Sequence, residues 1–151
     1  MVKKVLVLLV MGLFILSAAS DLYAAATAAE AKAMMEKATA FFKANGKEKA
    51  FAEFNNPKGQ FIKDDLYIFV IDTTGAVFAH GGNPLLVGKS LIGLKDSDGK
   101  PFIKEMIDAA NAKGTGWFDY NWTNPTTKKV QAKSTYFEKV GDLVFGCGIY
   151  K

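Results

Sequence analysis

The sequence predicts an α+β domain in which helices accompany an antiparallel sheet. Apolar residues recur at helical spacing in three segments, and runs rich in β-branched and aromatic residues fill much of the remaining chain. Short turns join these β-rich runs, as in hairpins. The predicted order is helix, helix, two strands, helix and three strands. Hairpin-linked strands with an intervening helix favour an antiparallel sheet over a parallel, doubly wound one.

The first residues have the layout of a secretory signal peptide. Lys3 and Lys4 make a short basic start, residues 5–16 form an uncharged apolar run, and small residues follow as far as Ala26. The apolar run is shorter than the roughly 20 residues that cross a membrane as a helix. We therefore expect residues 1–26 to be a signal peptide and the protein to be periplasmic or secreted. Without cleavage, the same segment would leave the protein anchored to the membrane.

Residues 27–151 are expected to form one domain, since about 125 residues suffice for a single core but not for two. The chain is 50% hydrophobic and has 12 Phe, which supply large side chains for that core. Its lone cysteine, Cys147, has no partner for an internal disulfide, so stability must come from packing.

The charged residues limit the kinds of partner. The formal net charge is +4, and the Lys residues are scattered among acidic ones, which is typical of a solvated surface and not of a nucleic-acid-binding one. All 19 basic residues are Lys. Because the chain has no Arg, a bidentate guanidinium contact to a carboxylate or phosphate is excluded. An anion must be held by Lys, His, Tyr, Trp or backbone N–H groups.

Two helical segments are predicted before the first strand. The first has an apolar stripe that faces the core, made of Ala31, Met34, Met35, Ala38, Phe41 and Phe42. Asn45 and Gly46 are expected to end this helix. A second short helix is expected from about Lys47, carrying Phe51 and Phe54, and residues 56–59 form a turn.

The strand at residues 66–71 is apolar on both alternating faces, so we expect it in the centre of the sheet, covered on both sides. Asp72 and Gly75 open and close the turn to its hairpin partner at residues 76–80, and residues 81–84 form a loop. A helix follows, entered at Pro101 and capped by Gly114. The last three strands are predicted at residues 117–122, 129–140 and 143–150.

Several linked runs resemble the single Cache domain family. They are D-L-Y-I-F-V-I-D-T-T-G from Asp65, V-F-A-H-G-G-N-P-L-L-V-G-K-S-L from Val77, D-G-K-P-F-I-K-E-M from Asp98, G-T-G-W-F-D-Y-N-W-T-N-P from Gly114, K-S-T-Y-F-E from Lys133 and V-F-G-C-G-I-Y-K from Val144. The similarity spans about Ala31 to Lys151. It implies a PAS-like extracytoplasmic sensor fold, with a long N-terminal helix packed on a curved antiparallel sheet and a pocket on the sheet's other side.

The resemblance implies small carboxylates and similar metabolites as ligands, and chemoreceptors or sensor kinases as the usual setting, between two membrane spans. This chain has one apolar segment and ends at its last predicted strand. We therefore expect an exported, stand-alone Cache domain that binds a small metabolite, above all a carboxylate. It would serve sensing, as in chemotaxis, with a membrane receptor or kinase as partner. A homodimer through the N-terminal helix is left open. The alternative is a structural or interaction protein with the Cache fold and no functional pocket.

Five residues are candidates for contacts to the ligand: His80, Tyr120, Trp122, Lys133 and Tyr136. His80, the only histidine, stands between a strand and the loop at residues 81–84. There it either donates to an anion or is hydrogen-bonded as an ordinary strand-end residue. With no second histidine it cannot belong to a His-rich metal site, and neither a metal nor a cofactor is expected.

Alternation along the strand 117–122 puts Phe118, Tyr120 and Trp122 on one face. Tyr120 and Trp122 combine an apolar body with a polar tip, which suits a pocket for a small organic acid, and ordinary core packing is the alternative. On the next strand Lys133 and Tyr136 have opposite parity, so both line one pocket only if a β-bulge intervenes. An inward Lys133 needs an anionic partner, whereas an outward one is merely solvated.

Catalysis has little support in the sequence. The aspartates stand beside turn residues, where they are common for backbone reasons, and no Ser/His/Asp or Cys/His arrangement stands out. The stretch from Gly82 to Ser90 ends like a phosphate-binding loop, but five residues, and not the required four, separate Gly82 from Gly88. We therefore predict a binding protein and not an enzyme.

Overall fold

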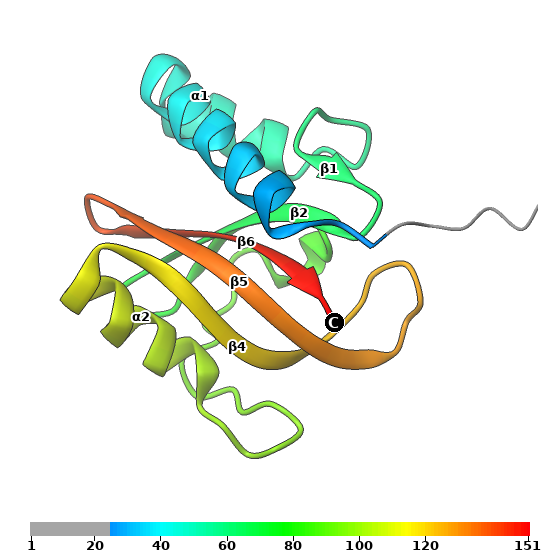
Figure 1. Cartoon of the computed structure of the whole chain (residues 1–151). Helices are drawn as coiled ribbons and strands as arrows, with labels where there is room; N and C mark the ends of the chain where they lie inside the picture. Colours follow the sequence, from blue (N-terminus) through cyan, green and yellow to red (C-terminus); the bar gives the residue numbers. More distant parts are fainter. Residues whose placement is uncertain (1–24) are drawn as a thin grey trace, which may run out of the picture.

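The computed structural model describes residues 25–151 (Figure 1). It places the long helix α1 (Ala28–Phe54) on one face of a six-stranded sheet and the shorter helix α2 (Phe102–Lys113) on the other. The predicted signal peptide at residues 1–26 falls almost entirely outside the described residues. Among the helices of residues 25–151, none combines the length and the hydropathy that a membrane span requires.

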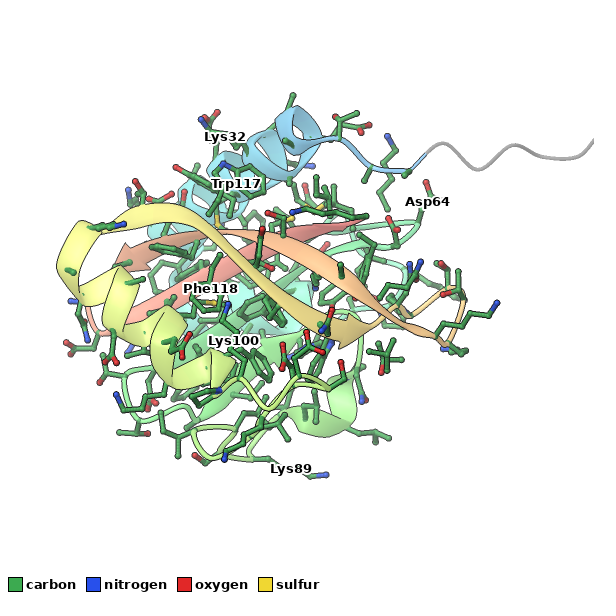
Figure 2. The ribbon with its side chains drawn as sticks, turned by 60° about the horizontal axis from the view of Figure 1, so that its bottom comes forward. Lys32, Asp64, Lys89, Lys100, Trp117 and Phe118 are labelled. Atoms are coloured by element: carbon green, nitrogen blue, oxygen red, sulfur yellow. The ribbon has the colours of Figure 1, made fainter. Side chains whose placement is uncertain are left out.

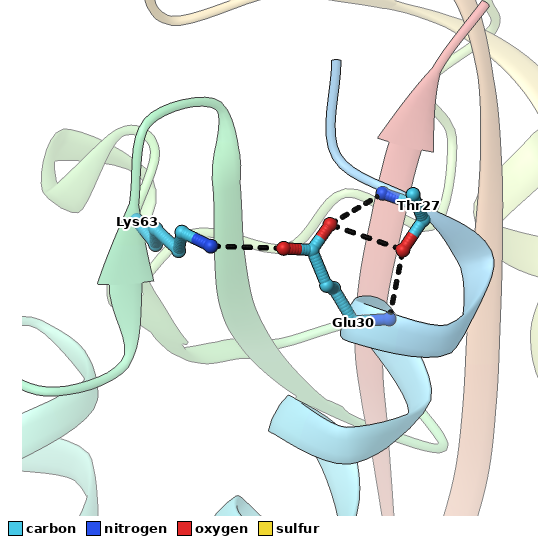
Figure 3. A network of polar contacts seen from close by, with 3 residues as sticks. All are labelled: Thr27, Glu30 and Lys63. Atoms are coloured by element: carbon cyan, nitrogen blue, oxygen red, sulfur yellow. Dashed lines mark hydrogen bonds and ion pairs between the residues drawn. The ribbon is translucent and has the colours of Figure 1, made fainter. Parts of the chain in front are cut away.

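The start of α1 is fixed by a capping box and an ion pair (Figure 3). Thr27 N–H donates to Glu30 Oε2 at 2.8 Å, and Glu30 N–H donates to Thr27 Oγ1 at 3.2 Å, so two free backbone donors are satisfied reciprocally. The other carboxylate oxygen accepts from Lys63 Nζ at 2.8 Å. Lys63 belongs to the short strand β1 (Ile62–Lys63), so this network ties the first turn of the helix to the edge of the sheet.

The predicted helix stop at Asn45 and Gly46 is a kink within α1. Gly46 has φ 79° and ψ 175°, outside the helical region, and glycine reaches this conformation without steric penalty. The Asn45 side chain donates to the Phe41 carbonyl at 2.9 Å and satisfies one acceptor at the break. The second predicted helix is therefore the C-terminal part of α1, which ends at Phe54.

The remaining strands are β2 (Leu66–Asp72), β3 (Val77–His80), β4 (Thr115–Thr123), β5 (Val130–Val140) and β6 (Leu143–Tyr150). The strand order is β1-β2-β6-β5-β4, with β3 paired to β2, and all pairings are antiparallel. The predicted α+β fold is thereby confirmed. The C-terminal strand β6 lies in the middle of the sheet, between β2 and β5, as Figure 1 shows.

β2 is covered on both faces, as its uninterrupted apolar sequence predicted. Leu66, Ile68 and Val70 pack in the core under α1, whereas Tyr67, Phe69 and Ile71 face the core under α2. Two features were not predicted because they are too short to show a period: the strand β1 and a 3-10 helix η1 (Pro84–Leu86) inside the predicted loop. Burial of one large apolar side chain contributes about 1.5–3 kcal/mol, and β2 buries such side chains on both faces, so β2 holds both layers together.

Candidate ligand-binding site

Lys133 is buried in the middle of β5, on the α2 side of the sheet. Its backbone pairs with Tyr120 of β4 and with Tyr150 of β6, so the three side chains share that face. Only 1% of Lys133 is exposed. Its Nζ donates to Tyr67 Oη at 2.7 Å and lies 4.1, 5.0 and 5.8 Å from the ring centres of Tyr67, Tyr150 and Phe69. The amine therefore sits in a cage of aromatic rings.

A directed chain of hydroxyl groups leads away from this amine. Tyr150 Oη donates to the Thr123 carbonyl at 3.0 Å and lies 3.3 Å from Tyr67 Oη. Because the single hydroxyl proton of Tyr150 is used at Thr123, Tyr67 must donate to Tyr150. The Tyr67 oxygen in turn accepts from Lys133 Nζ. Tyr67 therefore presents an acceptor to the amine.

No carboxylate pairs with Lys133 within residues 25–151. The ion pairs of this part of the chain join exposed side chains: Lys63 with Glu30, Lys104 with Asp108, and Lys151 with Asp119. Burial lowers the pKa of Lys133 to about 7, and the distant charge of Asp65 opposes this only in part. A buried ammonium without a counter-ion is costly, so the site is electrostatically incomplete and suited to an anion.

His80 packs beside this cage at the end of β3. Its ring lies 5.0 Å from the Tyr67 ring and 6.1 Å from the Trp122 ring, and its Nδ1 accepts from the Asn83 N–H at 2.9 Å. Burial, and then the charge of Lys133, lower the pKa of His80 to about 3. His80 is therefore neutral at neutral pH, with its proton on Nε2, and can act only as a neutral donor.

Tyr120 and Trp122 form an aromatic wall with the first turn of α2. Phe102 stacks on Tyr120 with ring centres 4.7 Å apart and planes 7° apart, and its ring centre is 5.5 Å from that of Trp122. The Tyr120 hydroxyl is hydrogen-bonded to Thr135 Oγ1 at 3.1 Å. Tyr120 thus contributes mainly its ring to the cavity beside it.

A cavity of about 10 Å³ lies between this wall and the sheet. Its lining is almost wholly apolar: Phe69, Ile71, His80, Leu91, Phe102, Ile103, Tyr120 and Trp122. That volume is about the space of one water molecule, so a ligand enters only if a wall moves. Trp122 also lines an outer groove of about 410 Å³ together with Gly82, Asn83 and Lys128. The indole thus lines both the cavity and the outer groove.

Two glycines of β6 make room for the site. A Cβ on Gly146 would collide with the Phe69 ring, and a Cβ on Gly148 would lie 2.5 Å from Lys133 Cε. Both glycines lie in β6 with a single residue, Cys147, between them, so both leave the α2 face of the strand open. This spacing of glycines in an apolar strand, which the sequence prediction did not use, is a local signal for a large side chain packed against that face.

The structure places four of the five predicted residues on one face and Tyr136 on the other. The register from Thr115↔Glu138 to Thr123↔Val130 is continuous, so no bulge turns Tyr136 towards Lys133. Instead its ring lies 5.4 Å from that of Trp117 and 5.3 Å from Lys32 Nζ. Figure 2 shows Trp117 and Lys32 on the α1 side and Phe118 with Lys100 on the other. The geometry gives Tyr136 no contact with the site.

Sequence reasoning missed Tyr67 and Tyr150, whose ring centres lie 4.1 and 5.0 Å from the amine. Each lies within an apolar strand, and nothing local indicates which strand Lys133 faces. Their roles depend on the pairing of β2 and β5 with β6, which is a long-range feature. Residues 25–151 hold no cluster of three His, Cys, Asp or Glu side chains that could ligate a metal.

Comparisons with known proteins agree with this fold. The family described as Single Cache domain 2 matches residues 20–150. A crystal structure of a methyl-accepting chemotaxis protein from Vibrio parahaemolyticus is 33% identical, with a TM-score of 0.65, over 79% of this chain and 84% of that one. A structure described as the basis for carboxylic acid recognition by a Cache chemosensory domain shares the fold. It is 23% identical, with a TM-score of 0.64, over 80% and 85% of the two chains.

A curated relative is the methyl-accepting chemotaxis protein McpP of Pseudomonas putida, 28% identical over 88 residues. The matched part is 57% of this chain but only 16% of McpP, so the chain spans about a sixth of that chemoreceptor. These relatives are chemoreceptors, and the two structures share the helix-and-sheet arrangement of Figure 1. Because the family match covers nearly all of the described residues, the chain belongs to the single Cache domain family and is a Cache sensor domain similar to those of chemoreceptors.

Proposed function

We propose that this protein binds a small monocarboxylate at Lys133 and reports its presence to a signalling partner without transforming it. The observation that carries the proposal is the buried amine of Lys133, which is caged by three aromatic rings and lacks a carboxylate within residues 25–151. A bound carboxylate would supply the missing counter-ion. A charge-assisted hydrogen bond of this kind contributes about 1.5–3 kcal/mol.

The surroundings of Lys133 favour one carboxylate over two. His80 is neutral, the cavity wall is otherwise aromatic and aliphatic, and the chain has no Arg. The second carboxylate of a diacid would be buried without a cation, at a cost of several kcal/mol. A short apolar remainder, as in an acid of two to four carbons, would instead contact Phe102, Tyr120 and Trp122. The ligand class is therefore a short monocarboxylic acid.

The proposed setting is outside the cytoplasm. The signal-peptide layout of residues 1–26 supports export, and the carboxylic acid recognition described for one structural neighbour supports the ligand class. The partner would be a membrane receptor or kinase, since the relatives are chemotaxis receptors. A homodimer through α1 would be one way to transmit the signal, because that helix lies on the face opposite to the site. Sensing by residues 27–151 as one Cache domain is thus the function we infer.

The small size of the cavity, about 10 Å³, favours a second candidate, a structural or interaction protein that keeps the fold without a ligand. Thermal unfolding of the purified protein separates the two. Acetate, propionate and pyruvate would be tested against the neutral analogue propionamide. A ligand at about 100 times its Kd stabilises the folded state by roughly 2.7 kcal/mol. For a domain of this size that raises Tm by several degrees, at about 3 °C per kcal/mol.

Two variants locate the binding site in the same assay. Lys133→Met should lose most of the acid-induced shift, because the cation is gone. Lys129→Met removes an exposed charge just before β5 and should keep the full shift. Equal shifts with acids and propionamide would contradict the pairing of a carboxylate with Lys133, and no shift with any acid would favour the structural protein.

A further inference from the structure

We propose that the site takes up its carboxylate together with a proton, so that the ligand is bound as a neutral acid overall and binding weakens at alkaline pH. The inference rests on the proposed function, since it describes how Lys133 would receive the anion. It adds one requirement to that function: above pH 7, Lys133 is mostly neutral before the ligand arrives and is charged once the ligand is bound.

The cage around Lys133 disfavours a charge when no ligand is bound. An ammonium group has three N–H donors, and the structure gives this one a single hydrogen bond, to Tyr67 Oη at 2.7 Å. The other near neighbours are the rings of Tyr67, Tyr150 and Phe69. Cation–π contacts compensate for lost hydration less fully than a carboxylate does. Deprotonation removes this imbalance, which agrees with the lowered pKa of about 7.

The groups facing Lys133 from the neighbouring strands are neutral at neutral pH. Burial raises the pKa of Tyr67, Tyr120 and Tyr150 above the usual value. Cys147, whose side chain lies on the α1 face of β6, is also neutral, because burial raises its pKa to about 12. His80 stays neutral because its pKa is lowered to about 3. The strands β2, β3, β4 and β6 therefore present no formal charge to the amine from these residues.

The nearest carboxylates lie at the margin of the site and are engaged elsewhere. A crevice of about 190 Å³ reaches Lys133 and is lined by Asp96, Asp98 and Asp119, with the cations Lys100 and Lys151. Asp96 accepts from the Asn121 N–H at 3.0 Å, Asp98 accepts from Asn121 Nδ2 at 2.7 Å, and Asp119 pairs with Lys151 at 2.9 Å. Asp65 accepts from Asn124 Nδ2 at 3.4 Å. None of the four forms an ion pair with Lys133.

A carboxylate that pairs with Lys133 raises the pKa of this amine, and the rise is linked to affinity. Above pH 7 the free protein must gain a proton before the ion pair forms, so the apparent affinity falls about tenfold for each pH unit. Below pH 7 the amine is already protonated, and the affinity is constant as long as the ligand itself stays ionised. Because half of the free amine is already neutral at pH 7, the dissociation constant should rise about 50-fold between pH 7 and pH 9.

Isothermal titration calorimetry with acetate and propionate tests this directly. At pH 8, heats measured in two buffers of different ionisation enthalpy should give an uptake of about 0.9 proton per ligand, and at pH 6 about 0.1. Lys133→Arg keeps a cation that does not deprotonate in this range, so a folded variant should bind with the same affinity at pH 7 and 9. The wild-type buffer comparison decides the question even if the larger arginine prevents folding.

Tyr67 acts in this scheme as a positioning residue. Tyr67→Phe removes the hydroxyl that accepts from Lys133 and leaves the ring in place, so the free amine loses its hydrogen bond and the midpoint of the affinity profile should move to lower pH. A role in packing alone would change stability but leave that midpoint at pH 7.

The outcomes of these experiments are distinct. Binding of acetate or propionate with equal dissociation constants at pH 7 and 9 and no proton uptake would overturn this inference and leave the proposed function standing. Absence of binding by acetate, propionate and pyruvate at every pH would overturn the proposed function, and this inference with it.

Discussion

The two faces of the sheet are built from alternate residues of the same strands, yet they differ in chemistry. The face under α1 is sealed by alanine, methionine and phenylalanine, and its buried residues carry no charge: Ala31, Met35, Ala38, Ala50, Phe54, Phe61, Leu66, Ile68, Val70 and Phe145 are among them. The face under α2 holds Lys133, His80 and three buried tyrosines. Both faces bury an apolar core, but only the α2 face also buries a titratable cation, Lys133.

The largest expected effect is on the α1 face. Phe54 is fully buried, with its ring 4.8 Å from that of Phe61 and 6.1 Å from that of Phe145. Phe54→Ala should lower the free energy of unfolding by about 3–5 kcal/mol, since it removes buried area and leaves a cavity. Urea denaturation measures the loss. If the variant folds, its affinity for acetate or propionate should be unchanged.

Leu85→Ala is the matched control for Phe54→Ala. Leu85 is 79% exposed on the η1 helix, so its truncation should change stability by no more than about 0.5 kcal/mol. Comparable losses in the two variants would contradict the division of roles between the faces.

The second effect concerns the α2 face without ligand. The folded pKa of Lys133, about 7, lies below the unfolded value of 10.5. Between these values the unfolded chain binds a proton that the folded protein lacks, so stability rises with pH by about 1.4 kcal/mol per unit. Below pH 7, Lys133 is protonated in both the folded and the unfolded state, so the full cost of burying its charge is included in the stability of the folded protein. Lys133→Met should therefore be more stable than wild type at pH 6, by about 3–5 kcal/mol, and this difference should shrink towards pH 10.5.

Urea denaturation at pH 6, 8 and 10 measures that difference. Lys129→Met, which removes an exposed charge, should keep the wild-type dependence on pH. Parallel plots of stability against pH for wild type and Lys133→Met would mean that Lys133 keeps an ordinary pKa. The α2 face would then bury no charge at a cost, and this difference from the α1 face would not exist.

The third effect is a steric test of the same face. A methyl group on Gly148 would lie 2.5 Å from Lys133 Cε and would also meet Thr135 Oγ1. Gly148→Ala should cost about 1–3 kcal/mol through overpacking, and it should weaken acetate and propionate binding at least tenfold. The control is Gly93→Ala, because a Cβ there meets nothing within 4 Å. Wild-type affinity in Gly148→Ala would show that Lys133 moves out of its cage to bind.

The sequence predicted the strand pattern well because alternation and hairpin turns are local. Six apolar residues in succession placed β2 at the centre, and β6 ends at Tyr150 as predicted. The site was predicted only in part. Alternation along β5 correctly put Lys133 and Tyr136 on opposite faces of the sheet. It could not show which of the two faces the α2 side, because that depends on how the strands pair across the sheet. Tyr67 and Tyr150 were missed for the same reason.

The smallest expected effect belongs to Tyr136, the predicted site residue that lies on the α1 side. Its ring packs between Trp117 and Lys32, and Tyr136→Phe keeps that ring. Stability should change by no more than about 0.5 kcal/mol, and the dissociation constant for acetate or propionate should stay within about twofold of wild type. Tyr67→Phe makes the same chemical change on the other face and should alter the pH profile of binding. A clear loss of binding in Tyr136→Phe would require β5 to acquire a bulge when ligand binds, since only such a shift turns Tyr136 and Lys133 to one face.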